Sequence, residues 1–168
     1  HNQEKLNDLL KSLNKIKNEE KKNIPILLKI SPDISDNHIS EIVTIAIENS
    51  ISALILTNTT NANRDNLTSD SKNEEGGLSG EPLQELSTKM IKKFYKKISG
   101  KIPIIGVGGV NSGKSAYEKI TAGASLLQLY TGFVYKGPTI VKNIKQELIE
   151  ILKNKGFSNI KEAIGKDS

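Results

Sequence analysis

Four short apolar runs in this 168-residue chain each carry or precede residues that could bind a ligand. These residues are Lys29 inside the first run, Thr57 to Thr60 after the second, Gly106 to Gly109 after the third, and Tyr130 to Gly132 after the fourth. Ligands of parallel α/β proteins gather at the carboxyl ends of the strands, so we treat these positions as the candidate site.

Each group has both a chemical and a structural explanation. Lys29 in a buried strand would need an anionic partner, although a lysine at a strand end can also extend its ammonium into water. Asn58 and Thr59 offer donors and acceptors to a planar polar ligand, although the same residue types form turns. Gly106, Gly108 and Gly109 would let the backbone approach a phosphate, helped by the free N–H groups of the next helix, or would form a tight turn. Residue types alone leave these explanations open.

The segment from Gly108 to Ser115 also fits the P-loop pattern G-x-x-x-x-G-K-[ST], with a strand expected before it and a helix after it. No other expected strand ends in the aspartate that would help to hold magnesium, and little chain remains to complete a nucleotide site. Lys114 also suits an exposed position in a first helical turn. We therefore interpret this match as coincidental.

The spacing of apolar residues predicts the elements that position these groups. Strands are expected at 25–30, 53–56, 102–105 and 125–129, and helices at 6–16, 39–46, 82–98, 114–122 and 140–152, with a short terminal helix after Ser158. The polar segment 57–80 is expected to be a long loop. The alternation predicts an α/β fold with a parallel sheet, either open and doubly wound or part of a closed barrel.

Composition excludes several other classes of protein. The net charge is +5, but lysines such as Lys92, Lys93, Lys96 and Lys97 are scattered along expected outer helix faces, and the chain has only one arginine, Arg64, so we expect solvated helix faces and no nucleic-acid partner. Without cysteine the chain has no thiolate zinc site and no disulfide. No apolar run reaches the roughly 18 residues of a membrane span.

Taken together, the segments around the strand ends resemble one known family. The matching segments are Ile26-Leu-Leu-Lys29-Ile-Ser-Pro-Asp33, Leu56-Thr-Asn-Thr-Thr60, Gly76-Gly-Leu-Ser-Gly80 with Pro82-Leu83, Pro103-Ile-Ile-Gly-Val-Gly-Gly-Val110, Ala122-Gly-Ala-Ser-Leu-Leu-Gln-Leu-Tyr-Thr131 and Lys161-Glu-Ala-Ile-Gly165. They occur in order over nearly the whole chain, and they are similar to those of dihydroorotate dehydrogenases. Gly-Gly-Leu-Ser-Gly and Gln-Leu-Tyr-Thr resemble the quinone-dependent class 2 enzymes.

The resemblance implies a (β/α)8 TIM barrel, of which residues 1–168 would supply the last four βα units as the C-terminal half of a single FMN-binding domain. The resemblance also implies which ligand each site residue contacts. Lys29 would lie near the flavin ring, Thr57 and Gly80 would contact FMN, and Asn58 and Thr59 would bind orotate. The FMN phosphate would be held by Gly108, Gly109, Tyr130 and Thr131.

The implied reaction oxidises dihydroorotate to orotate, with FMN as hydride acceptor and a quinone as final electron acceptor, in pyrimidine biosynthesis. The catalytic base, a serine in class 2 enzymes, is expected in the N-terminal half, so no catalytic residue is assigned to this chain. That half would also carry the helices that contact the bacterial cytoplasmic membrane or the mitochondrial inner membrane. Four strands cannot close a barrel, so we expect the chain to function beside its N-terminal half and to aggregate or partly unfold alone. The alternatives are another FMN-dependent barrel oxidoreductase and a non-catalytic half-barrel that binds FMN or phosphate.

Overall fold

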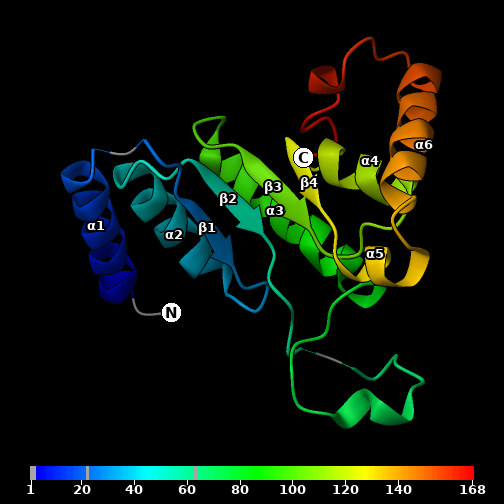
Figure 1. The fold of residues 1–168 in the computed structure, drawn as a ribbon, viewed down its shortest axis with the longest axis horizontal. Helices are drawn as coiled ribbons and strands as arrows, with labels where there is room; N and C mark the ends of the chain where they lie inside the picture. Colours follow the sequence, from blue (N-terminus) through cyan, green and yellow to red (C-terminus); the bar gives the residue numbers. More distant parts are fainter. Residues whose placement is uncertain (1–2, 22, 63) are drawn as a thin grey trace.

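A computed structural model describes residues 3–21, 23–62 and 64–168 as four parallel strands that alternate with helices (Figure 1). The strands are β1 (Leu27–Ile30), β2 (Ala53–Leu56), β3 (Ile104–Val107) and β4 (Leu126–Gln128), and they lie side by side in chain order. The helices are α1 (Gln3–Glu19), α2 (Asp36–Glu48), α3 (Gln84–Ile98), α4 (Gly113–Thr121), α5 (Thr131–Lys136) and α6 (Ile140–Asn154). Short 3₁₀ turns cover Asp70–Asn73, Glu81–Leu83 and Ile160–Glu162. The α/β alternation expected from the sequence is confirmed.

The helices bury one face of the sheet. Leu54, Leu56 and Ile104 point to this face and are almost fully buried, together with Ile91 and Phe94 of α3. Alternate side chains of a strand point to opposite faces, so only every second strand residue reaches this core. A second apolar cluster joins α4 to α6 through residues such as Ile120 and Ile144.

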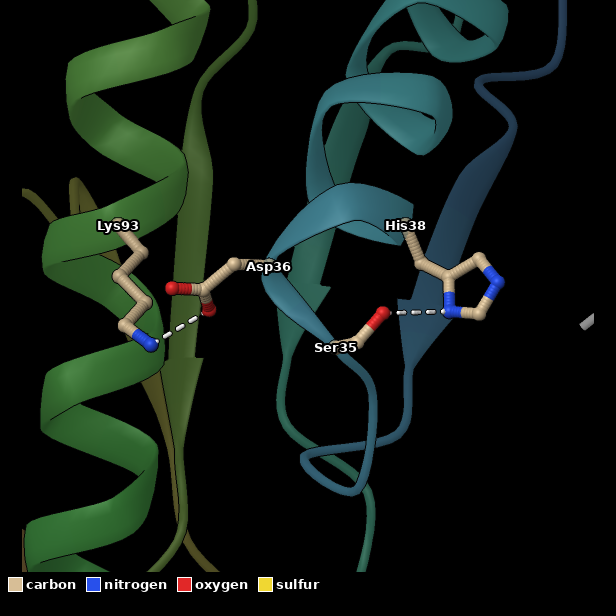
Figure 2. A network of polar contacts seen from close by, with 4 residues as sticks. All are labelled: Ser35, Asp36, His38 and Lys93. Carbon is tan, nitrogen blue, oxygen red and sulfur yellow. Dashed lines mark hydrogen bonds and ion pairs between the residues drawn. The ribbon is translucent and has the colours of Figure 1, made fainter.

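Polar contacts at the helix surfaces support the same layer. Lys93 Nζ of α3 lies 2.6 Å from Asp36 Oδ1 in the first turn of α2, and Ser35 Oγ lies 3.0 Å from His38 Nδ1 (Figure 2). Exposed ion pairs of this kind contribute less than about 1 kcal/mol. Lys93 therefore lies on a solvated helix face, as expected, and its ion pair connects α3 to the first turn of α2.

The opposite face of the sheet is exposed at the edge strands β1 and β4 in this chain, whereas Ile105 at its middle is 7% exposed. The register aligns Lys29 with Ile55, Ile55 with Ile105 and Ile105 with Leu126, which gives one row across this face. Leu126 is 63% exposed, and Lys29 is exposed as well. In a closed barrel such a row points inward and is packed. Of the two explanations that the sequence leaves open for Lys29, the exposed lysine at a strand end agrees with this chain.

Several elements differ from the sequence expectation. β3 begins two residues later than expected, so Gly106 belongs to the strand rather than to the loop after it. A Cβ at Gly106 would meet Ala124, Ile91 and Leu127 at 3.0 to 3.3 Å, so this glycine makes room for packing and does not face a ligand. α1 continues to Glu19 through charged residues, and α5 was not expected from the sequence. No helix in the described ranges has the length and apolarity needed to cross a membrane.

Candidate functional site

A pocket of about 840 Å³ lies at the carboxyl ends of the four strands. It is lined by the segments that follow β2, β3 and β4, by Lys29 of β1, and by the loop that leads into α3. All nine residues expected to bind cofactor or substrate line it: Lys29, Thr57, Asn58, Thr59, Gly80, Gly108, Gly109, Tyr130 and Thr131. The fold thus brings together residues that are up to 102 positions apart in the sequence, from 29 to 131.

Thr57 forms the floor of the pocket between the ends of β2 and β3. Its backbone N–H donates to the Val107 carbonyl at 3.0 Å, which ties the two strand ends together. Its side chain is 2% exposed, and its hydroxyl has no partner among the described residues. A buried hydroxyl without a partner costs roughly 1 to 3 kcal/mol, so a ligand that supplied a hydrogen bond here would recover that cost.

Asn58 and Thr59 are fixed by local hydrogen bonds. The Asn58 backbone N–H donates to the Ile30 carbonyl at 2.7 Å, and its side-chain oxygen accepts the Thr59 N–H at 2.9 Å. This orients the Asn58 amide so that its NH₂ group keeps its donors for a ligand acceptor. A Cβ on Gly77 would collide with the Thr59 hydroxyl, so Gly77 is the residue that lets the two segments approach.

Asp33 anchors the start of the loop after β2. Its carboxylate accepts the Thr60 hydroxyl at 2.5 Å and the Asn61 N–H at 2.7 Å. Thr60 and Leu78 then pair as an antiparallel bridge, which closes the base of the loop. Neither Asp33 nor Gly77 is predicted from the sequence to have a role in the site, although both lie in segments that carry the family resemblance.

Beyond this bridge the loop projects away from the sheet (Figure 1). Arg64 connects its segments by hydrogen bonds. Its guanidinium donates to the carbonyls of Lys72 at 3.1 Å, Glu74 at 2.6 Å and Gly76. These hydrogen bonds connect Arg64 to residues 72–76 on the returning side of the loop. The loop is therefore ordered by polar contacts at the rim of the pocket.

The glycine turn after β3 lies close to the first turn of α3. Gly108 and Gly109 both have positive φ, and a Cβ at Gly109 would lie 2.7 Å from the Gln84 Cα atom. A Cβ at Gly108 would meet Leu83 and Ser87 at 3.1 Å. Only glycine suits both the conformation and the space. The backbone N–H groups of Gly109 and Val110 have no acceptor among the described residues, so they remain able to bind an anion.

The N-terminus of α4 does not add to this anion site, contrary to expectation. Four amides around its start are already bonded: the N–H groups of Asn111 and Ser112 donate to Ser115 Oγ, Ser115 N–H donates to Ser112 Oγ, and Gly113 N–H donates to Glu147 Oε2 at 2.5 Å. A P-loop needs these amides for phosphates, and Lys114 is exposed and does not line the pocket. The interpretation of the P-loop match as coincidental is supported.

The remaining wall comes from the end of β4 and the loop before α3. Ser79 Oγ and Thr131 Oγ1 lie 2.9 Å apart, and a Cβ on Gly80 would lie 2.9 Å from Thr131 Cγ2. Tyr130 lies at the mouth, 79% exposed. Lys136 donates to the Asn111 carbonyl at 3.0 Å, so its charge also lies at the glycine-turn side of the pocket.

The pocket contains more cations than carboxylates. Its cationic side chains are Lys29, Arg64, Lys72 and Lys136, and its carboxylates are Glu74, Glu75 and Glu81. No group of three or more metal-ligating side chains occurs within residues 3–21, 23–62 and 64–168. Unbonded amides, glycines and lysines suit an anionic organic ligand.

A parallel α/β sheet with its pocket at the strand carboxyl ends belongs to the class that includes the TIM barrels. The dihydroorotate dehydrogenase family model matches residues 1–152, and the chain belongs to that family. It is 48% identical over 147 residues to a dihydroorotate dehydrogenase (quinone) from Christiangramia forsetii, covering 88% of this chain and 43% of the relative. A mitochondrial dihydroorotate dehydrogenase (quinone) from Mus musculus is also 48% identical, over 142 residues, covering 84% and 36%.

A solved structure agrees with this assignment. The crystal structure of DHODH from Eimeria tenella in complex with ferulenol superposes with a TM-score of 0.83 and 42% identity, covering 87% of this chain and 39% of that one. The chain therefore spans well under half the length of these relatives. Its fold matches part of their barrel, which explains the uncovered face of the sheet.

Proposed function

We propose that this chain supplies the cofactor-binding and part of the substrate-binding side of a quinone-dependent dihydroorotate dehydrogenase, which oxidises dihydroorotate to orotate. The observation that carries this proposal is the single pocket that contains all nine expected ligand-binding residues. The similarity to quinone enzymes at 48% identity supports the same reaction. The site would work together with the part of the barrel that this chain does not contain.

The donors that line the pocket support FMN as its ligand. Thr57 has a buried hydroxyl without a partner, and Gly109 and Val110 have unbonded backbone amides. Gly80 and Gly109 let the backbone of these two turns approach Thr131 and Gln84, because a Cβ at either position would collide with those residues. We assign Thr57 and Gly80 to the flavin, and Gly108, Gly109, Tyr130 and Thr131 to its phosphate. When bound, FMN would supply the hydride acceptor.

The chain's own residues would prepare the site for this reaction. Lys29 would hold a positive charge beside the flavin ring, where it favours the anionic reduced form. Asn58 would donate its NH₂ protons to orotate, because its carbonyl oxygen already accepts the Thr59 N–H. Thr59 would present its hydroxyl to the same ligand, at the place where Gly77 keeps the neighbouring segment close.

The catalytic base and the quinone contacts are assigned to the remaining part of the enzyme, as is attachment to a bacterial or mitochondrial inner membrane. Two alternatives stay under test: an FMN barrel with another substrate, and a half-barrel that binds FMN or phosphate without catalysis. Asn58 and Thr59 distinguish the proposed enzyme from an FMN barrel with another substrate, because these two residues are assigned to orotate and not to the FMN phosphate.

A fusion protein tests the proposal. The part of the Christiangramia forsetii relative that precedes its matched segment is joined in front of this chain, and we call this protein the barrel fusion. It should purify with yellow FMN whose absorbance bleaches anaerobically on addition of dihydroorotate and returns with a soluble quinone. A fusion that binds FMN but is not reduced by dihydroorotate would support the non-catalytic alternative, and a colourless one would contradict the FMN site.

A further inference from the structure

Lys119 of α4 is a fully buried lysine outside the pocket. Its ammonium donates to the Gln84 carbonyl at 3.3 Å, to Ser87 Oγ at 3.1 Å and to Thr88 Oγ1 at 3.1 Å. All three acceptors belong to the first turns of α3. The side chain is 0% exposed and has no ion pair among the described residues.

Such a lysine is costly to maintain. Burying an ammonium with only neutral oxygens around it costs several kcal/mol, which an apolar side chain of similar size would avoid. A positive charge beside the first turn of a helix is also disfavoured by the helix dipole. An apolar side chain could also pack α4 against α3, so we look for the role of Lys119 in the groups that accept its hydrogen bonds.

A chain of hydrogen bonds leads from Lys119 to the pocket floor. Ser87 Oγ accepts from Lys119 and donates to the Val107 carbonyl at 2.6 Å. The same carbonyl accepts the Thr57 N–H at 3.0 Å. The next residue, Gly108, packs on Ser87 so closely that a Cβ would lie 3.1 Å from Ser87 Cβ.

The cation gives Ser87 a single orientation. A helical serine can donate to the carbonyl four residues earlier in its own helix instead of to a neighbouring element. While Lys119 donates to the hydroxyl oxygen from one side, the Ser87 proton is directed to Val107. A hydroxyl polarised by a cation is also a stronger donor, which fits its 2.6 Å distance.

We infer that Lys119 is a positioning residue for the FMN site: through Ser87 it holds the Val107 carbonyl, and with it the Thr57 amide and the glycine turn at Gly108 and Gly109. This inference rests on the proposed FMN site. In this proposal, α4 and α3 together fix the carboxyl end of β3 on the side of the sheet that the helices cover.

The test replaces Lys119 with methionine in the barrel fusion. Methionine matches the length of the lysine stem, and the oxygens left behind can bond within α3, because Thr88 donates to the Gln84 carbonyl at 2.8 Å and the released Ser87 hydroxyl can donate to the carbonyl four residues earlier in its helix. Lys119→Met should therefore fold, while its dissociation constant for FMN rises by about tenfold, the effect of one charge-assisted hydrogen bond. Lys114→Met, an exposed lysine of the same helix, is the matched control and should leave FMN affinity unchanged.

Two further measurements separate positioning from general stability. Ser87→Ala should weaken FMN binding to a similar degree, and the double variant should lose no more than either single variant, because both act through one chain. In the apoprotein, hydrogen exchange at the amides of Thr57 and Gly108 should accelerate in Lys119→Met and not in Lys114→Met.

The outcomes are distinguishable. Unchanged hydrogen exchange and unchanged FMN affinity in Lys119→Met would overturn the inference while leaving the FMN site intact. Additive losses in the double variant would also overturn it, since Lys119 and Ser87 would then act separately. If the unsubstituted fusion binds no FMN, the proposed function fails, and accelerated exchange in Lys119→Met would still support the contact to the end of β3.

Discussion

At the scale of single residues, the pocket combines side chains with defined hydrogen-bond directions. Asn58 is the sharpest case, because its oxygen is occupied by Thr59 and its NH₂ group is not. Replacing Asn58 with alanine should weaken orotate binding by about 1 to 3 kcal/mol, the cost of leaving polar ligand atoms unpaired. Titration of the barrel fusion with orotate, followed by the flavin absorbance, measures this directly.

Asn61→Ala is the control for that substitution. Asn61 lies in the same loop but contacts Asp33 through its backbone N–H, which alanine retains. Orotate affinity should stay unchanged in this variant. Equal affinity in Asn58→Ala and the unsubstituted fusion would contradict the assignment of Asn58 to the substrate.

Lys119 also predicts a pH dependence of stability. Burial lowers its pKa to about 8, and Glu118 opposes this shift. The other charged side chains near its partners line a neighbouring hollow: Glu81, Glu85, Lys89, Lys92 and Asp167. Because the unfolded chain keeps the ordinary value of 10.5, it binds more protons than the folded chain between pH 8 and 10.5.

This lysine should therefore raise the free energy of unfolding as the pH increases through that window, by about 3 kcal/mol at most. Below pH 8 it is protonated in both states, and its full cost is present. Urea unfolding of the barrel fusion at several pH values measures the rise. Lys119→Met should lack this component and be at least as stable near pH 8, and an identical pH profile in both proteins would argue against a buried cation.

At the scale of elements, the strand ends could be predicted from the sequence, and the loop contacts could not. Each apolar run has the length of a buried strand, so the sequence alone identifies the residues that follow it. The sequence wrongly predicts Gly106 in the loop, because a glycine at the end of an apolar run does not reveal whether it serves a turn or packing. Asp33, Gly77 and Arg64 act through contacts with distant loop segments, which periodicity does not encode.

The loop after β2 offers a test at this scale. Gly77→Ala should displace the Thr59 hydroxyl, because the added methyl would occupy its position, and orotate affinity should fall by about tenfold or more. Gly76→Ala is the control: it strains a positive φ in the same loop, but a Cβ there meets nothing within 4 Å. Equal orotate affinity in both variants would mean that loop strain, rather than the Thr59 contact, controls the substrate site.

At the scale of the whole molecule, the chain holds the strand ends of one sheet but not a closed layer. β1 and β4 are edge strands within the described chain, and the face that bears Lys29, Ile55 and Leu126 lacks the packing of a barrel interior. Unpaired strand edges and exposed apolar rows favour association with other chains. The relatives, of which this chain covers about two fifths, supply further sequence that would cover both.

We therefore expect the isolated chain to form soluble aggregates or a partly unfolded state, and the barrel fusion to be compact. Gel filtration with light scattering, together with binding of a dye specific for exposed apolar surface, distinguishes the two. A monomeric isolated chain that unfolds cooperatively would contradict this expectation, because it would mean that the helix layer alone stabilises the sheet. FMN binding by such a chain would then locate the whole phosphate site in the glycine turn and the end of β4, without any contribution from the rest of the barrel.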